Sequence, residues 1–201
     1  MHKIEIVSDL SEYIKIFLAE NAKVNLISKN DEKYLFEKHI YDSLGIKLFF
    51  EKYNIKTASI LDIGCGGGFP CVPIALEFPH YQVTGVDSIG KKIQAVNNVK
   101  DALHIQNLNL IYDRAENIKD KKYDIVVSRA VADLSKICSY ALPLTKKDGY
   151  FVAYKSKKIS EEISEAETVL QKFNAKIIDI IDYTLPLEEV YERKLVVIKQ
   201  Q

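Results

Sequence analysis

The spacing of apolar residues changes near residue 57, and this change divides the chain into two patterns. Before it, apolar side chains recur every three or four residues, which is the stripe of one helix face. The first stripe comprises Leu10, Tyr13, Ile14, Phe17 and Leu18. A second helical segment is predicted from Asp31 to Tyr53, with acidic side chains at its start. The pattern therefore predicts an N-terminal helical extension over residues 1–56.

From Thr57 onward, short apolar runs alternate with helical spacings. Strands are predicted at residues 59–63, 82–86, 108–112, 123–128, 150–154, 176–183 and 193–199. Helices are predicted at residues 69–78, 89–103, 134–142 and 159–173, with Ser88 as a cap of the second and Asp148-Gly149 as a turn. This alternation favours an α/β fold, in which a mostly parallel sheet carries helices on both faces. We expect residues 57–201 to form one compact unit of this kind.

A glycine-rich stretch joins the first predicted strand to the helix that follows it. It reads Asp62-Ile63-Gly64-Cys65-Gly66-Gly67-Gly68-Phe69-Pro70, so an acid lies two residues before the first of three alternating glycines. Glycines allow the backbone to turn sharply or to lie against a ligand, because they carry no Cβ. A helix that starts at Phe69-Pro70 would point free N–H groups toward this turn. The stretch therefore predicts a cradle for a polar ligand.

Two ligands compete for this cradle. The dinucleotide fingerprint G-x-G-x-x-G needs a third glycine, but alignment on Gly64 and Gly66 puts Phe69 there. The observed spacing is similar to the S-adenosylmethionine loop of class I methyltransferases, which have a Rossmann-like fold. Asp62 could attract the ammonium of that cofactor, directly or through water, while amides of the turn hold its carboxylate. A glycine turn without a ligand is the third alternative.

Further polar residues lie at the carboxyl ends of the predicted strands, where ligands bind in parallel sheets. They are Asp62, Asp87, Asp113-Arg114, Ser128-Arg129 and Lys155, and we expect them to converge on one rim. Asp87 lies 23 residues after Gly64, where a carboxylate can accept hydrogen bonds from a ribose diol. The same carboxylate could instead cap the next helix.

The segment after the fourth predicted strand, Ser128-Arg129-Ala130, offers an arginine but no obvious base or nucleophile. Cys65 and Cys71 belong to the glycine loop, and Cys138 lies well inside a predicted helix. An acceptor atom with a free lone pair, such as guanine N7, needs no deprotonation, so positioning and electrostatics could suffice for catalysis. Arg129 could then hold the cofactor carboxylate or a substrate phosphate, or it could form a salt bridge at the rim.

His39 and Asp42 lie three residues apart on a predicted helix, so their side chains share a face. Such a pair can serve in catalysis. A structural hydrogen bond from the N-terminal extension to the sheet is the favoured interpretation.

Composition narrows the function classes without choosing among them. The 201 residues carry 28 basic and 28 acidic side chains, so net charge gives no support for a nucleic-acid partner. A local patch could still hold phosphates, and the basic residues predicted at the rim are Lys91, Lys92, Arg114, Arg129, Lys155, Lys157, Lys158, Arg193 and Lys194. With no apolar run of about twenty residues, no predicted signal peptide and three cysteines without metal-like spacing, we expect a cytoplasmic protein without a metal site.

Several blocks, in order along nearly the whole chain, form a pattern that is more specific than the glycine loop. They are Lys23-x-Asn25-Leu26, His39-x-x-Asp42-Ser43-Leu44, the glycine loop, Val86-Asp87-Ser88-x-x-Lys91-Lys92, Arg114-Ala115-Glu116, Ser128-Arg129-Ala130-Val131-Ala132 and Glu192-Arg193-x-Leu195-Val196-Val197. This series resembles the bacterial small-subunit ribosomal RNA guanine-N7 methyltransferases, the glucose-inhibited division protein B family.

The resemblance implies an S-adenosylmethionine-dependent enzyme that methylates guanine N7 in the 530 loop of 16S rRNA, as RNA or within the small ribosomal subunit. It implies cofactor contacts at Gly64, Phe69, Ala115, Glu116 and Arg129, to which the loop pattern and the strand ends add Asp62, Gly66 and Asp87. We expect a monomer with no membrane partner. The alternatives are a methyltransferase of another RNA, a protein or a small molecule, and a dinucleotide-binding oxidoreductase.

Overall fold

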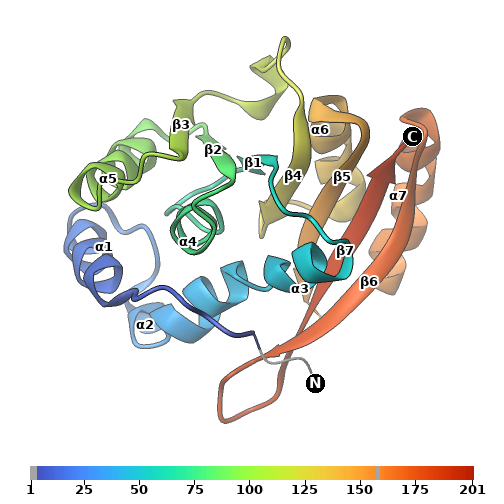
Figure 1. The fold of residues 1–201 in the computed structure, drawn as a ribbon. Helices are drawn as coiled ribbons and strands as arrows, with labels where there is room; N and C mark the ends of the chain where they lie inside the picture. Colours follow the sequence, from blue (N-terminus) through green and yellow to red (C-terminus); the bar gives the residue numbers. More distant parts are fainter. Residues whose placement is uncertain (1–3, 157–158) are drawn as a thin grey trace.

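Residues 4–156 and 159–201 are described by a computed structural model, in which seven strands form one sheet (Figure 1). The strands are β1 (Ser59–Ile63), β2 (Gln82–Asp87), β3 (Leu108–Tyr112), β4 (Tyr123–Arg129), β5 (Thr145–Ser156), β6 (Ala175–Leu185) and β7 (Tyr191–Gln200). Their order in the sheet is β3-β2-β1-β4-β5-β7-β6. The first five strands pair in parallel, whereas β7 runs antiparallel to both β5 and β6. The predicted fold class is therefore confirmed.

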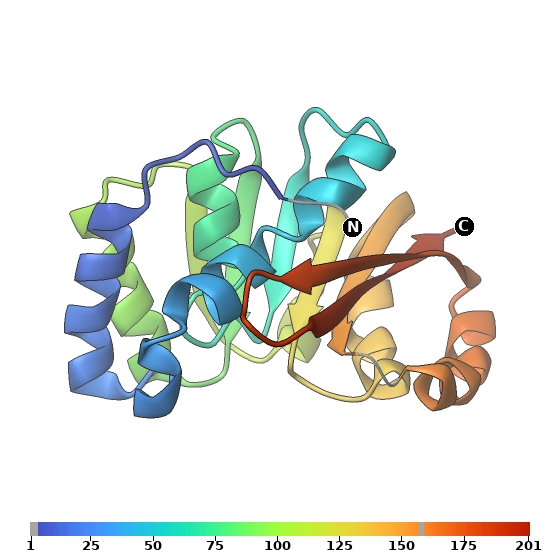
Figure 2. The same ribbon diagram turned by 90° about the horizontal axis from the view of Figure 1, so that it is seen from below.

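Helices cover both faces of this sheet. They are α1 (Ser11–Val24), α2 (Lys29–Glu32), the π-helix η1 (Leu35–Tyr41), α3 (Ile46–Lys52), α4 (Cys71–Glu77), α5 (Gly90–Ala102), α6 (Leu134–Ala141) and α7 (Ser160–Lys172), with short 3₁₀ turns η2 (Ala115–Asn117) and η3 (Leu142–Leu144). In Figure 1 the strands form an arc, with α4 seen end-on inside it and α6 and α7 on its other side, and Figure 2 shows the same layers from below.

Alternate residues of each strand supply the two hydrophobic clusters between these layers. In β1, Ile60 belongs to the cluster under α4 and α5, while the next residue, Leu61, belongs to the cluster under α6 and α7. In β4, Val127 and Val126 divide in the same way. Both faces are buried because strand residues point to alternate sides, and this explains the continuous apolar runs in the sequence.

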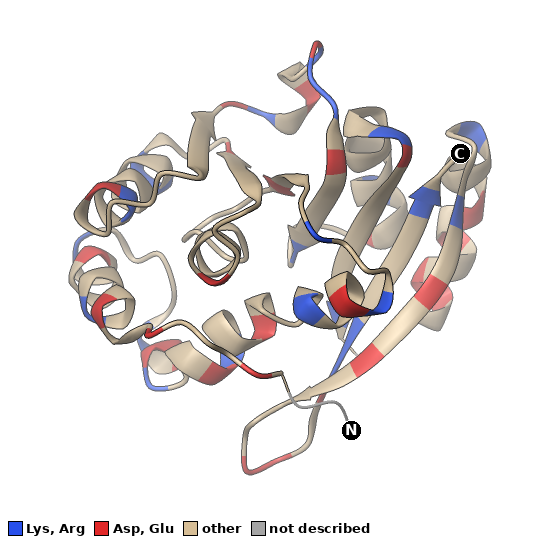
Figure 3. Ribbon diagram, in the orientation of Figure 1, with Lys and Arg blue, Asp and Glu red and all other residues tan. Residues whose placement is uncertain are grey.

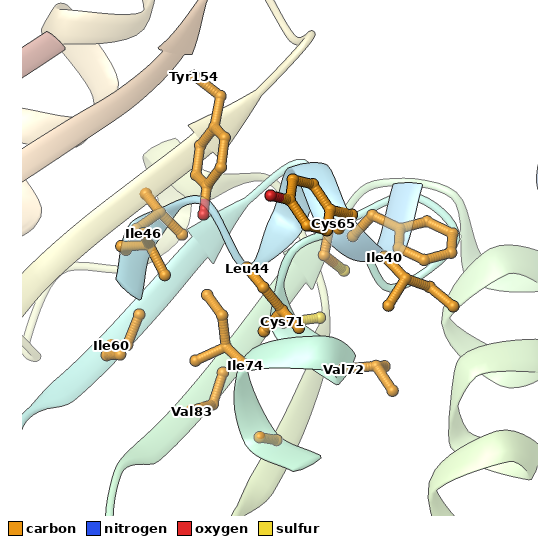
Figure 4. Packing of buried hydrophobic residues seen from close by; sticks show 14 of the residues in the cluster. Ile40, Leu44, Ile46, Ile60, Cys65, Cys71, Val72, Ile74, Val83 and Tyr154 are labelled. Atoms are coloured by element: carbon orange, nitrogen blue, oxygen red, sulfur yellow. The ribbon is translucent and has the colours of Figure 1, made fainter. Parts of the chain in front are cut away.

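The N-terminal segment belongs to the first of these clusters. Ile40 and Leu44 are fully buried, and they pack in one cluster with Ile60 of β1, Ile74 of α4 and Val83 of β2 (Figure 4). Residues up to 56 therefore share their core with the sheet. The boundary near residue 57 marks a change of pattern in the sequence and stays a prediction as a domain limit.

The prediction of one helix from Asp31 to Tyr53 is wrong, because the structure divides this segment into α2, η1 and α3. Between η1 and α3, the chain passes very close to the sheet. A Cβ on Gly45 would lie 2.7 Å from the ring of Tyr183, and the Ser43 hydroxyl donates a hydrogen bond to the carbonyl of His39. These contacts come from β6 and from the segment's own turns, so helix periodicity alone did not reveal them.

Three smaller predictions also need correction. The helix after the glycine loop begins at Cys71 rather than Phe69, with Pro70 as its N-cap. Ser88 does not cap α5; instead the Asp87 carboxylate accepts a hydrogen bond of 2.8 Å from the Ile89 N–H. Asp148-Gly149 lies within the bounds of β5, at a register shift in the pairing of β5 with β4, and Asp148 has a φ of 59°.

Candidate cofactor and active site

A cavity of about 630 Å³ opens at the carboxyl ends of β1, β2, β3 and β4. Its walls come from the loops that follow these four strands, from η1, from the connection between α1 and α2, and from α6. This position is where ligands bind in open α/β sheets, and the volume lies in the range of small-molecule sites. The predicted site residues in its wall are Gly64, Gly66, Phe69, Asp87, Ala115, Glu116 and Arg129.

The glycine loop forms the floor of this cavity. Gly64, Gly66 and Gly68 have φ angles of 70°, 54° and 90°, a region that favours glycine. The N–H groups of Gly64 and Cys65 both donate to the carbonyl of Val86, at 2.8 and 3.0 Å. The loop is therefore tied to the end of β2, and Gly64 and Gly66 line the cavity.

Asp87 joins the glycine loop to the second loop of the site. Its Oδ2 accepts a hydrogen bond from the Gly66 N–H at 2.9 Å, and its Oδ1 accepts one from the Ile89 N–H at 2.8 Å. Each carboxylate oxygen has a further lone pair, so these bonds leave Asp87 able to accept from a ligand. The capping alternative and the ligand alternative are thus compatible.

Asp62 lies behind the glycine loop and does not line the cavity. Its Oδ2 accepts a hydrogen bond from the Cys71 N–H at 3.0 Å, while Oδ1 has no hydrogen-bond partner within the described part of the chain. Burial raises the pKa of Asp62 to about 7, although the Cys71 N–H and the charge of Arg129 act in the opposite direction. A direct contact between this carboxylate and a ligand would require the loop to shift.

The third loop contributes Ala115 and Glu116 at the start of η2. Ala115 is buried and Glu116 exposed, and both line the cavity. Asp113 shapes this loop, because its Oδ1 accepts hydrogen bonds from the Arg114 N–H at 2.7 Å and from Asn117 Nδ2 at 2.6 Å.

Arg129, at the end of β4, is more deeply engaged than a surface salt bridge. Its Nη1 donates to the carbonyl of Lys38 at 2.9 Å and to Oδ2 of Asp42 at 3.0 Å. Its Nη2 lies 3.1 Å from Nδ1 of His39, and the guanidinium carbon lies 5.4 Å from the ring centre of Phe69. The side chain is 11% exposed.

His39 is neutral and its tautomer follows from this contact. Arginine can only donate, so Nδ1 of His39 accepts and the proton resides on Nε2. Burial and the neighbouring charge of Arg129 lower the pKa of His39 to about 4. Nε2 is buried and has no hydrogen-bond partner among residues 4–156 and 159–201.

Asp42 connects the N-terminal segment to three strands of the sheet. Its carboxylate accepts hydrogen bonds from the Tyr183 hydroxyl at 2.7 Å and from Nε and Nη2 of Arg193 at 2.9 and 2.7 Å, besides the bond from Arg129. Burial alone would raise the pKa of Asp42, but the bonds from Arg193 and the charge of Arg129 outweigh it and keep the pKa below its usual value. Asp42 thus makes the structural hydrogen bonds from the N-terminal extension to the sheet that the sequence analysis favoured.

The basic residues predicted at the rim do not form one patch. Lys155 donates to the carbonyl of Ala132 at 2.9 Å and pairs with Glu162 at 2.5 Å, so it joins the loop before α6 to α7 and does not line the cavity. Arg193 forms an ion pair with Asp42, and Lys194 forms one with Asp182. Lys157 and Lys158 lie outside the described residues. The basic residues that line the cavity are Lys92, Arg114, Arg129 and Lys136. Of these, Lys136 was not predicted from the sequence.

Charges of both signs are interspersed along most helices (Figure 3). The three cysteines are free and buried, and burial raises the pKa of Cys138 to about 12 and that of Cys71 well above its usual value. These shifts disfavour the thiolate forms of Cys71 and Cys138. The described residues contain no cluster of His, Cys, Asp or Glu arranged to bind a metal, and none of their helices is both long and apolar enough to cross a membrane.

The fold is that of the class I S-adenosylmethionine-dependent methyltransferases. The structure of M. jannaschii TYW2 in complex with AdoMet superposes with a TM-score of 0.60 at 14% identity, over 76% of this chain and 75% of that chain. A ribosomal protein L11 methylase from Lactobacillus delbrueckii subsp. bulgaricus gives 0.59 at 15% identity, over 80% of this chain and 78% of the other. At such low identities the likeness establishes the fold alone.

Sequence comparison then shows the family. The family model described as GidB, rRNA small subunit methyltransferase G, matches residues 6–186. The ribosomal RNA small subunit methyltransferase G of Bacillus licheniformis is 40% identical over 196 residues, 94% of this chain and 80% of the relative. That of Staphylococcus aureus is 36% identical over 208 residues, 100% of this chain and 86% of the relative.

The chain belongs to the rRNA small subunit methyltransferase G family, as the blocks in its sequence predicted. It is a methyltransferase, and a solved structure with the same fold was determined in complex with AdoMet. The oxidoreductase alternative is thereby removed.

Proposed function

We propose that this enzyme transfers a methyl group from S-adenosylmethionine to guanine N7 in the 530 loop of 16S rRNA. Small-subunit rRNA as the acceptor follows from the family. The observation that carries the choice of atom is the cavity wall at the end of β4. Arg129 and the neutral His39 lie there beside Phe69, and the neighbouring carboxylate of Asp42 is already engaged by two guanidinium groups.

This wall suits an acceptor atom that already has a free lone pair. Guanine N7 is such an atom, whereas an exocyclic amine or a pyrimidine carbon needs a base or a nucleophile. The reaction then requires that the acceptor be held in line with the methyl group and that water be excluded. Positive charge accumulates on the methylated base, so an unprotonated His39 is better suited to this wall than a cationic one.

The cofactor supplies an activated methyl group on a sulfonium, and the residues of the cavity fit its parts. We assign its amino-acid end to the glycine loop at Gly64 and Gly66, with Arg129 and Phe69 at the adjoining wall. Its ribose diol is assigned to Asp87, and its adenine to Ala115 and Glu116. Asp62 contributes negative charge from behind the loop, and its unpaired buried Oδ1 favours a cationic group nearby.

The proposal includes the setting of the reaction. We infer that the enzyme acts as a monomer in the cytoplasm, where ribosomal subunits are assembled. The acceptor is 16S rRNA, free or within the small subunit.

The substrate is tested by incubating the protein with S-adenosylmethionine labelled in its methyl group. Small subunits, naked 16S rRNA, transfer RNA and a protein mixture are offered separately. The proposal predicts label in 16S rRNA from the first or second sample. Label only in transfer RNA or protein would contradict it.

A further inference from the structure

We propose that Asp42 is a positioning residue of the methyltransferase site, which fixes the guanidinium of Arg129 in the orientation that binds the cofactor. The N-terminal segment would thus complete the active site as well as cover the sheet. This inference rests on the proposed contact between Arg129 and S-adenosylmethionine.

The hydrogen bonds of Arg129 leave its guanidinium little freedom. Both hydrogens of Nη1 are used, one by the carbonyl of Lys38 and one by Asp42, and one hydrogen of Nη2 points to His39. The two other N–H groups of Arg129 have no hydrogen-bond partner in the described parts of the chain. Because the guanidinium is planar and rigid, the three engaged N–H groups fix the direction of the two that remain. These two are available to a ligand in the cavity that Arg129 lines.

Asp42 can fix Arg129 because it is itself held from a distant part of the chain. Arg193 of β7 binds its carboxylate through two nitrogens, and the Tyr183 hydroxyl of β6 adds a third bond. The side chain of Asp42 is 1% exposed, so water does not compete for these bonds. A bidentate arginine pair defines geometry more tightly than a single contact. Asp42 therefore links Arg129 by hydrogen bonds to residues of β6 and β7.

The net charge of this cluster also favours an anionic ligand in the cavity. One carboxylate, Asp42, faces two guanidinium groups, Arg129 and Arg193, while His39 is neutral. The charges of these four side chains sum to one positive charge, and Arg129 and His39 reach the cavity wall. An anionic group of a ligand compensates that charge, and the carboxylate of S-adenosylmethionine is such a group. Arg193 and Tyr183 already give both carboxylate oxygens of Asp42 a hydrogen bond. The bond from Arg129 is therefore not needed to satisfy this buried carboxylate.

A double-mutant cycle on cofactor affinity tests this proposal. The full chain and its Asp42→Asn, Arg129→Lys and doubly substituted variants are titrated with S-adenosylhomocysteine by calorimetry, and circular dichroism verifies their fold. We expect Asp42→Asn to weaken binding about tenfold when Arg129 is present and less than twofold in the Arg129→Lys background, since coupled neighbours are not additive. Equal losses in both backgrounds, or no loss in either, would overturn the proposal.

Two further variants separate positioning from general stability. Glu77→Gln is the matched control, because the Glu77 side chain is 2% exposed and accepts the N–H groups of Val7 and Ser8 away from the cavity. It should lower stability and leave the affinity for S-adenosylhomocysteine unchanged; an equal loss of affinity would assign the Asp42 effect to stability.

If Asp42→Asn does not fold, Tyr183→Phe replaces it in the cycle, and we expect a smaller loss of affinity in the same direction. Unchanged affinity in Arg129→Lys alone would overturn the proposed cofactor contact, while methylation of 16S rRNA tests the acceptor separately.

Discussion

At the scale of single residues, the acidic side chains of this site are engaged by the protein itself. Asp87 accepts the N–H groups of Gly66 and Ile89, Asp62 accepts that of Cys71, and Asp42 accepts two guanidinium groups. These bonds fix the loops before a ligand arrives. Preorganisation of this kind lowers the entropic cost of binding and of aligning the reacting atoms.

Asp62 should make both stability and cofactor affinity depend on pH. Its pKa is about 7 in the folded protein against 3.8 ordinarily, so its stabilising contribution is complete below about pH 4 and lost as pH rises through 7. At about 1.4 kcal/mol per pKa unit, the loss amounts to a few kcal/mol. Asp62→Asn removes this loss, so we expect urea unfolding to show the variant gaining stability relative to the parent between pH 4 and pH 8.

Cofactor affinity should change in the opposite sense. An ionised Asp62 attracts the ammonium of S-adenosylhomocysteine, so affinity measured by calorimetry should rise between pH 6 and pH 8 in the parent. The rise should be absent in Asp62→Asn. The same pH profile in both proteins would show that Asp62 does not act on the ligand.

At the scale of elements, the glycine loop has two kinds of glycine. Gly68 packs into the core, where a Cβ would lie 2.7 Å from a methyl group of Val72 and 3.1 Å from one of Val96. Gly66 lines the cavity, and the nearest atom to its Cβ would be 3.9 Å away. Both have positive φ, so the backbone cost of alanine is similar and the surroundings differ.

This difference predicts that one alanine variant mainly loses stability and the other mainly loses ligand affinity. Gly68→Ala should cost about 2–3 kcal/mol of unfolding free energy, because strain in the backbone adds to overlap with buried methyl groups. Gly66→Ala should cost about 1 kcal/mol and weaken binding of S-adenosylhomocysteine more strongly, because the new methyl group enters the cavity. Chemical denaturation and calorimetry on both variants make the comparison. Equal stability losses would contradict the assignment of the two glycines.

The strands could be predicted from the sequence more closely than the N-terminal helices. β1 and β3 match their predicted limits. Burial on both faces gives β1 a short apolar run with clear ends, whereas β3 is an edge strand that is only partly buried. The break between η1 and α3 could not be predicted, because Gly45 there lies against Tyr183 and Asp42 is bound by Arg193. Those residues lie well over a hundred positions away in the sequence, and pattern analysis is blind to such contacts.

At the scale of the whole molecule, the N-terminal segment and the sheet form one core. Phe17 of α1 is fully buried, its ring centre lies 5.0 Å from that of Phe69 in the glycine loop, and both belong to the cluster that includes β1 and β2. The segment is therefore coupled to the cofactor loop by packing and to Arg129 by Asp42. Unfolding should be a single cooperative event.

Phe17→Ala tests this coupling. Loss of a buried phenyl ring should cost about 3–5 kcal/mol and shift the entire denaturation curve, with far-ultraviolet circular dichroism and S-adenosylhomocysteine binding lost together. Val7→Ala is the control, since Val7 is 80% exposed and its removal should be nearly neutral. Early loss of helix signal with binding preserved would show that the N-terminal segment unfolds independently of the site.

The sequence also predicted the cavity but missed how its wall is supported. Glycine spacing and strand ends are local signals, so Gly64, Gly66 and Asp87 could be placed at the site in advance, and the family resemblance added Ala115 and Glu116. Arg129 could be placed there too, but its partners Asp42 and His39 meet it only through the fold, and Arg193 was read as a rim cation. Lys155, at the end of β5, was misplaced because it pairs with Glu162 of α7 instead of facing the cavity.

The identity of the methylated atom tests the account most directly. 16S rRNA or small subunits that lack the modification are incubated with the protein and labelled S-adenosylmethionine, digested to nucleosides and separated by chromatography with mass detection. The account predicts that the label elutes as 7-methylguanosine and maps to the 530 loop. Label in any other nucleoside, or 7-methylguanosine that maps elsewhere in the RNA, would contradict it.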